Sequence, residues 1–280
     1  MLVAADYLEL LEHLPAERAL RQHTFDGNLD CALRMRGQEL LERLLLHVAD
    51  RARVAVVDLV LELAARDADL LGVDTDEEVA RVDQGLRAVA AAPPLATRPS
   101  PAAALAEPVL SSDERRTSAA LMRVNHAGEV AAQALYQGQS LFARNGATRD
   151  LLASAAHEER DHLAWCATRI DELGGRTSLL GPLWYAGSLG LGVLAGLRAD
   201  AENLGFVRET ERQVEAHLRD HLQRLPAHDE KSAAILSRMA EDEMHHGTTA
   251  ALAGGAELPA AIRGCMKVGG EILRRIALIV

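Results

Sequence analysis

Two Glu-x-x-His pairs, Glu159 with His162 and Glu243 with His246, stand out among the residues of this chain that could do chemistry. Residues three apart on a helix lie on one face, so each pair could direct a carboxylate and an imidazole at the same point. One such pair is weak evidence, because the chain has 11 histidines and many glutamates and the spacing recurs by chance. Either pair alone could equally lie on a solvated helix face or contain a histidine that hydrogen-bonds within the core.

A glutamate that precedes each pair at a similar distance is the stronger signal. Glu129 lies 30 residues before Glu159, and Glu211 lies 32 residues before Glu243. A helix with an inward Glu followed by a helix with an inward Glu-x-x-His, present twice, is the ligand layout of di-iron and di-manganese carboxylate four-helix bundles. The predicted metal ligands are therefore Glu129, Glu159, His162, Glu211, Glu243 and His246.

The charges of this set explain why a metal is expected. Four glutamates that converge inside a bundle would repel one another and raise one another's pKa values unless cations balanced them. Two divalent ions would cancel the four negative charges, and oxygen and imidazole ligands without thiolate favour iron or manganese over structural zinc. We expect iron for redox chemistry. Glu158 and Asp242 each stand four residues before a predicted ligand histidine and are candidates to orient a histidine, including one across the bundle.

Helices must position these side chains, and the composition favours helices. Aromatic residues make up 3% of the 280 residues and Ala, Leu, Glu and Arg are abundant. A capping box from Ser111 to Glu114 opens a long apolar-periodic stretch that we expect to stop at Gly146. The further helices are predicted at about 148–173, 199–225, 229–253 and 258–279, each ending before glycine or proline or at the end of the chain.

The uncharged stretch 178–197 separates the second and third of these helices. Its length meets the threshold of roughly 20 residues for spanning a bilayer, yet Pro182 and five glycines make it a poor continuous helix. Three interpretations stay open: a transmembrane span, an interfacial or channel-lining insertion, and a crossover that packs against the bundle.

The chain outside the bundle carries no catalytic spacing. We predict a helical extension of unknown role at 1–74, a helix and a Pro-rich linker at 75–110, and the metal-binding domain at 111–280. The N-terminus has no basic region followed by an apolar stretch, so no secretory signal is expected. Three dispersed cysteines indicate neither a disulfide framework nor a thiolate zinc site, and the net charge of −11 argues against nucleic acid as a partner.

Four segments together resemble the demethoxyubiquinone hydroxylase family of ubiquinone biosynthesis. They are RVNHAGEVAAQALYQGQ (123–139), EERDHLAWC (158–166), GFVRETERQVEAHL (205–218) and DEMHHG (242–247), and the similarity runs from about Thr75 through RPSPA at 98–102 to the C-terminus. NHAGE with its downstream Glu-x-x-His is far more specific than Glu-x-x-His alone. Residues 1 to about 74 have no counterpart in this resemblance.

The resemblance implies an all-α, ferritin-like four-helix bundle with a crossover between its second and third helices and extra N- and C-terminal helices. It implies a di-iron monooxygenase that uses O2, with NADH as electron source, to hydroxylate the ring of a prenylated demethoxyubiquinol. Glu159 and Glu243 would bridge the two irons, Glu129 and His162 would complete one site, and Glu211 and His246 the other. The implied location is the cytoplasmic side of the bacterial inner membrane, peripherally bound, with other ubiquinone-biosynthesis proteins as further partners.

Two other classes of function compete with this one. A ferritin-like iron oxidase or storage protein would share the six ligands but lack the long apolar crossover. A non-enzymatic, membrane-associated helical adaptor would keep the apolar segments and need no metal. Measurement of bound iron and of quinol hydroxylation separates the three.

Overall fold

A computed structural model of the protein describes residues 96–280, and these residues form helices and no strand. The helices, in chain order, are α4 (Ser112–Phe142), α5 (Gly146–Glu172), α6 (Gly181–Gly196), α7 (Asp200–Arg224), α8 (Glu230–Leu252) and α9 (Ala260–Ile279). The predicted helical extension at 1–74 and the helix and first part of the linker at 75–95 lie outside the described residues.

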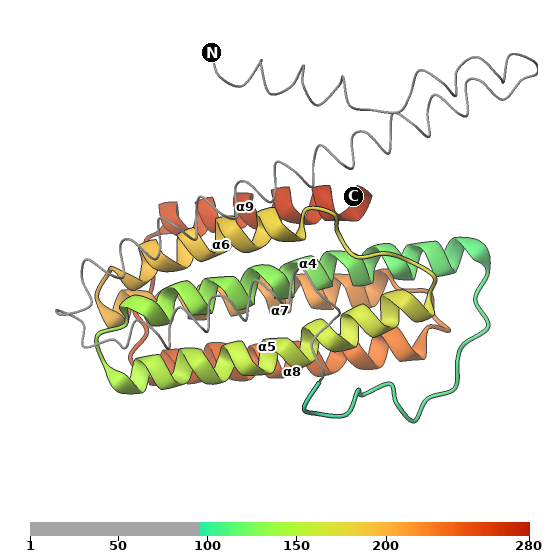
Figure 1. The fold of residues 1–280 in the computed structure, drawn as a ribbon, viewed down its shortest axis with the longest axis horizontal. Coiled ribbons are helices and arrows are strands. Elements are labelled where there is room, and N and C mark those ends of the chain that lie inside the picture. The colour runs from blue at the N-terminus through green and yellow to red at the C-terminus, as the bar shows by residue number, and fades with distance from the viewer. Residues whose placement is uncertain (1–95) are drawn as a thin grey trace, which may run out of the picture. The chain divides into compact units, whose positions relative to one another are not determined.

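Four long helices, α4, α5, α7 and α8, lie alongside one another as a bundle (Figure 1). In the chain, α6 comes between α5 and α7, and it lies along α4 (Figure 1). The connection from α5 to α7 is therefore one long crossover. One long crossover is the connection of ferritin-like folds. The predicted all-α, ferritin-like architecture is confirmed, including the extra C-terminal helix α9.

The ends of the long helices follow local capping chemistry. Ser111 and Glu114 form the predicted capping box at the start of α4. We had expected Gly146 to end the first long helix, but it begins the second. The Asn145 side chain accepts a hydrogen bond from the Ala147 amide and caps α5. The expected stop at the other end of α5 is present, because Gly174 adopts a positive φ of 68° directly after it.

The uncharged stretch forms a regular helix, contrary to the expectation that its proline and glycines would interrupt one. Pro182 lies in the first turn of α6, where its missing N–H costs no hydrogen bond. The glycines permit close packing: a Cβ built on Gly192 would lie 2.1 Å from the Leu135 carbonyl oxygen of α4, and one on Gly138 of α4 would lie 2.4 Å from the Leu189 carbonyl oxygen. Within residues 96–280 no helix is both long and apolar enough to cross a bilayer.

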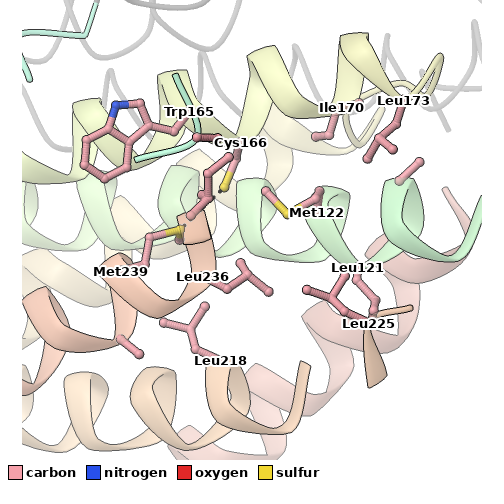
Figure 2. Close-up of a cluster of buried hydrophobic side chains, with 14 of the residues drawn as sticks. Leu121, Met122, Trp165, Cys166, Ile170, Leu173, Leu218, Leu225, Leu236 and Met239 are labelled. Carbon is pink, nitrogen blue, oxygen red and sulfur yellow. Dashed lines mark hydrogen bonds between the residues drawn. The ribbon is translucent and has the colours of Figure 1, made fainter. Parts of the chain in front are cut away.

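An apolar core joins the four long helices (Figure 2). Its buried members come from every one of them and include Leu121, Met122, Trp165, Cys166, Ile170, Leu218, Leu236 and Met239. Beside this core, the buried Arg169 of α5 forms an ion pair with the buried Asp229, which caps α8. The core fixes the helices in register, which is a precondition for side chains from four helices to meet at one point.

The described part of the linker, 96–110, contains turns and no helix and packs against the bundle. The Thr97 amide donates a 2.6 Å hydrogen bond to Asp161 of α5, and Glu107 pairs with Arg169. This segment is therefore attached to the bundle at two points.

Candidate metal centre

All six predicted ligand side chains lie inside the bundle. Each of the four long helices contributes: α4 carries Glu129, α5 carries Glu159 and His162, α7 carries Glu211, and α8 carries Glu243 and His246. Every one of them is buried, with His246 the most exposed at 6%. The three-residue spacing thus places each Glu-x-x-His pair on the inward face of its helix, as the sequence predicts.

The six side chains form two overlapping groups. In each group one ligand atom per residue lies within 4.8 Å of all the others. One group is Glu129, Glu159, His162 and Glu243, and the other is Glu159, Glu211, Glu243 and His246. Glu159 and Glu243 belong to both groups, which is the division between bridging and terminal ligands that the family resemblance implies. That these residues bind iron stays a prediction.

Both histidines direct Nδ1 into the centre. His162 Nδ1 lies 3.0 Å from Glu159 Oε2 and 3.3 Å from Glu243 Oε1. His246 Nδ1 lies 3.4 Å from Glu159 Oε1 and 3.3 Å from Glu243 Oε2. The two imidazoles are therefore arranged symmetrically about the two shared carboxylates.

The outward nitrogens meet the two carboxylates that we had expected to orient a histidine. His162 Nε2 lies 3.0 Å from Asp242 Oδ2, and His246 Nε2 lies 3.4 Å from Glu158 Oε2. Each contact crosses the bundle between α5 and α8. A carboxylate that accepts the Nε2 proton leaves the Nδ1 lone pair free for a metal, which is the usual outer arrangement around metal-binding histidines.

The side chains of the centre, taken by themselves, are electrostatically unbalanced. Burial, followed by repulsion from Glu159, holds the pKa of Glu129 well above its usual range, and burial with repulsion from Glu243 does the same for Glu211. Burial opposes charge on Glu159 as well, but the charge and hydrogen bond of His162 hold its pKa well below the usual range. Burial also opposes charge on His246, yet its close contacts with the carboxylates of Glu159 and Glu243 raise its pKa to about 12.

The donor atoms present suit two hard or borderline cations. Glu129 Oε2, Glu159 Oε1, Glu211 Oε1 and Glu243 Oε1 are buried and have no hydrogen-bond partner among the described residues. A buried carboxylate oxygen without a partner is costly unless a cation or proton satisfies it. No thiolate joins the set, because the nearby Cys166 lies in the apolar core. Ligation by carboxylates and imidazoles alone fits iron or manganese.

Comparison with known sequences agrees with this geometry. The family described as "Ubiquinone biosynthesis protein COQ7" matches residues 116–277, which span all six ligand positions. The chain belongs to this family. Among curated members, the "3-demethoxyubiquinol 3-hydroxylase" of Nitrosomonas europaea is 53% identical over 205 residues, which cover 73% of this chain and 98% of that protein. The proteins of the same name from Nitrosococcus oceani and Legionella pneumophila are 51% and 53% identical over 72% and 71% of this chain, and over 94% and 93% of their own lengths.

The centre of this COQ7-family chain has further polar neighbours. Asn125, one turn before Glu129, accepts hydrogen bonds from His221 Nδ1 at 2.9 Å and His217 Nε2 at 3.3 Å if those nitrogens carry the protons. Tyr136, two turns after Glu129, is fully buried, and its hydroxyl has no hydrogen-bond partner in the described region. These residues line the bundle interior beside the ligands without joining either metal-binding group.

Sequence reasoning missed one residue next to the centre, Arg98. It contacts Asp161, Asp242 and Glu158 from the segment before α4. No periodicity marks Arg98, because it lies in a Pro-rich stretch without helix, and its partners are 60 to 144 residues away in sequence. Only its place in RPSPA, within the family resemblance, signalled it.

Proposed function

We propose that this protein is a 3-demethoxyubiquinol 3-hydroxylase, a di-iron monooxygenase that hydroxylates the ring of a prenylated demethoxyubiquinol in ubiquinone biosynthesis. One observation carries the proposal: four carboxylates and two imidazoles, buried in a ferritin-like bundle, form two metal-binding groups that share Glu159 and Glu243. Membership of a family whose curated relatives bear this enzyme's name supports the substrate class.

The six residues take distinct roles in this proposal. Glu159 and Glu243 would be shared by two iron ions, Glu129 and His162 would complete the ligand set of one, and Glu211 and His246 that of the other. The two irons, when bound, supply the activation of O2 that insertion of oxygen into an aromatic C–H bond requires. We propose NADH as the source of the electrons that the reaction consumes.

The protein's own contribution is positioning and exclusion of water. Asp242 accepts the outward Nε2 proton of His162, and Glu158 lies 3.4 Å from the outward Nε2 of His246, so a carboxylate stands behind each imidazole whose Nδ1 faces the centre. The near-complete burial of the ligand set keeps bulk water from the reacting ring and strengthens every electrostatic interaction around it. Four of the carboxylate oxygens have no hydrogen-bond partner among residues 96–280 and so are available to cations.

A prenylated substrate needs an apolar approach, and the proposal includes a membrane surface that delivers it. Trp184 of α6 and Leu273 of α9 pack on the same α4 residues, so the two helices cover one side of the bundle (Figure 1). Eight large apolar side chains on or directly after these two helices are exposed: Leu191, Leu194, Leu197, Ile262, Val268, Ile272, Leu278 and Ile279. We define these eight residues as the α6–α9 face. The proposal places it against the cytoplasmic side of the inner membrane, with the protein bound peripherally and within reach of other ubiquinone-biosynthesis proteins.

The test removes one ligand from each pair. Glu159→Ala and His246→Ala should lower bound iron and should slow quinol hydroxylation by more than the ~10–100-fold typical of losing an outer partner, because a ligand itself is lost. Helical content by circular dichroism should remain near that of the unmodified protein. His245→Ala is the matched control, since His245 is the exposed neighbour of His246 on α8. Full hydroxylation by His246→Ala would contradict the ligand assignment.

A further inference from the structure

Arg98 reaches the metal centre from outside the bundle helices. Its Nε donates to Asp161 Oδ2 at 2.7 Å, and its Nη1 donates to Asp242 Oδ2 at 2.9 Å. The same Nη1 lies 3.7 Å from Glu158 Oε2. One guanidinium therefore contacts three carboxylates, two on α5 and one on α8.

Two of these carboxylate oxygens are the atoms that face the histidines. Asp242 Oδ2 contacts both Arg98 and His162 Nε2, and Glu158 Oε2 contacts both Arg98 and His246 Nε2. The guanidinium is thus connected to each of the two imidazoles through a single shared carboxylate oxygen. In the described part of the chain, no other cationic side chain is recorded in contact with both Glu158 and Asp242.

Arg98 is itself held in place. Asp161, its third partner, also accepts hydrogen bonds from the Thr97 amide at 2.6 Å and the Thr97 hydroxyl at 3.0 Å. The guanidinium lies 4.9 Å from the Trp165 ring centroid, and Trp165 Nε1 donates to the Arg98 carbonyl oxygen. These contacts hold both the backbone and the guanidinium of Arg98. They leave its side chain 30% exposed and restrict the direction in which the charged group points.

We infer that Arg98 is a positioning residue that holds Asp242 and Glu158 against the outward nitrogens of His162 and His246 and so orients both halves of the centre at once. The inference deepens the proposed function and rests on it. Glu158 depends on Arg98 more than Asp242 does, because Asp242 is buried and also pairs with Arg238 at 2.7 Å, whereas the Glu158 side chain is 34% exposed. Without Arg98, Glu158 is free to turn into solvent and leave the outward nitrogen of His246 without its carboxylate.

The planar shape of the guanidinium matters for this role. Its Nε and Nη1 donate in fixed directions to carboxylates on two helices, whereas a lysine ammonium is a single point charge. Lysine at this position can satisfy one or two of the three carboxylates but cannot reproduce the fork. Arg98→Lys should therefore restore only part of what Arg98→Gln loses.

The experiment measures iron rather than activity alone. Full-length Arg98→Gln protein, loaded with 57Fe(II), should bind iron about tenfold more weakly than the unmodified protein, the lower end of the range for outer partners of metal ligands. Its Mössbauer spectrum should change at both iron sites. Arg238→Gln is the matched control: Arg238 contacts Asp242 and Glu241 but not Glu158, so its loss should alter at most one site. Arg98→Lys should give an intermediate iron affinity.

Several outcomes would overturn the inference. Iron affinity and spectra of Arg98→Gln equal to those of the unmodified protein would do so, as would a change confined to one site like that of Arg238→Gln. A loss of helical content and melting temperature in Arg98→Gln, with normal spectra in a folded Arg98→Lys, would show Arg98 to be structural only. If the unmodified protein bound no iron or failed to hydroxylate the quinol, the proposed function would fail and the inference with it, a result distinct from all the others.

Discussion

Each ligand histidine lies between an inner pair of carboxylates and one outer carboxylate, and this decides where protons reside in the metal-free centre. Burial opposes charge on both rings, but attraction from Glu159 and a hydrogen bond to Asp242 raise the pKa of His162 well above its usual range, and the pKa of His246 is raised to about 12. The pKa values of Glu129 and Glu211 are raised as well. At neutral pH the metal-free centre therefore holds protons that metal binding must displace.

Proton release should accompany iron binding, with a sign that follows from these shifts. Metal ligation requires neutral imidazoles and ionised carboxylates, so Fe(II) binding expels the protons and its apparent affinity should fall as the pH falls. Linkage gives about tenfold per pH unit for each proton released, hence ~100-fold per unit if only the two imidazolium protons leave. Calorimetry of Fe(II) binding in two buffers of different ionisation enthalpy measures the count. A binding heat that is independent of the buffer would contradict this picture.

At the residue scale, the sequence could predict the six side chains but not their outer contacts. Helical spacing places Glu159 and His162 on one face whatever surrounds them, because that is a property of the helix itself. Asp242 and Glu158 could be proposed as orienting groups from their spacing to His246 and His162. Which histidine each one contacts depends on the packing of α5 against α8, and the structure pairs each with the histidine of the other helix.

Helix α6 shows how packing overrides local preference at the scale of an element. Glycines inside a helix cost up to about 1 kcal/mol each relative to alanine, which is why 178–197 was expected to be a poor helix. The cost is offset where the glycines let two backbones approach. Gly138 of α4 and Gly192 of α6 lie at such a contact, where any side chain would meet a backbone carbonyl. Composition reveals the glycines, but only the partner helix reveals which of them are needed.

Two glycines of α6 should therefore respond to alanine in opposite ways. Gly192→Ala should destabilise the protein by about 1–3 kcal/mol, the usual cost of overpacking, because its Cβ would lie 2.1 Å from the Leu135 carbonyl oxygen. Gly187→Ala, in the same helix, has nothing within 4 Å of its Cβ and should stabilise the protein by up to about 1 kcal/mol. Chemical denaturation followed by circular dichroism measures both. Equal effects of the two substitutions would show that the α4–α6 contact is looser than described.

At the scale of the whole described bundle, most of the exposed large apolar side chains lie away from the ligand helices. The ligands lie among α4, α5, α7 and α8, while most exposed large apolar side chains belong to α6 and α9; Met244 and Leu252 of α8 are exposed as well. Helix α9 adds basic side chains, Arg263, Lys267, Arg274 and Arg275, against one acidic residue, Glu271. An apolar face with basic residues is typical of a helix that lies in the interface of an anionic membrane.

Binding to lipid vesicles should depend on the α6–α9 face and not on exposed apolar residues elsewhere. Leu194→Glu and Ile272→Glu place a charge on side chains that are 63% and 51% exposed, and each should weaken co-sedimentation with anionic phospholipid vesicles by about tenfold or more, since the burial of one large apolar side chain is lost and an anion is added. Val109→Glu is the control, because Val109 is 95% exposed but belongs to the segment before α4. Raising the salt concentration should weaken binding of the unmodified protein further if the basic residues of α9 contribute. Co-sedimentation that is unchanged in both α6–α9 variants, or lost equally in Val109→Glu, would remove the membrane from the proposed function while leaving the metal centre intact.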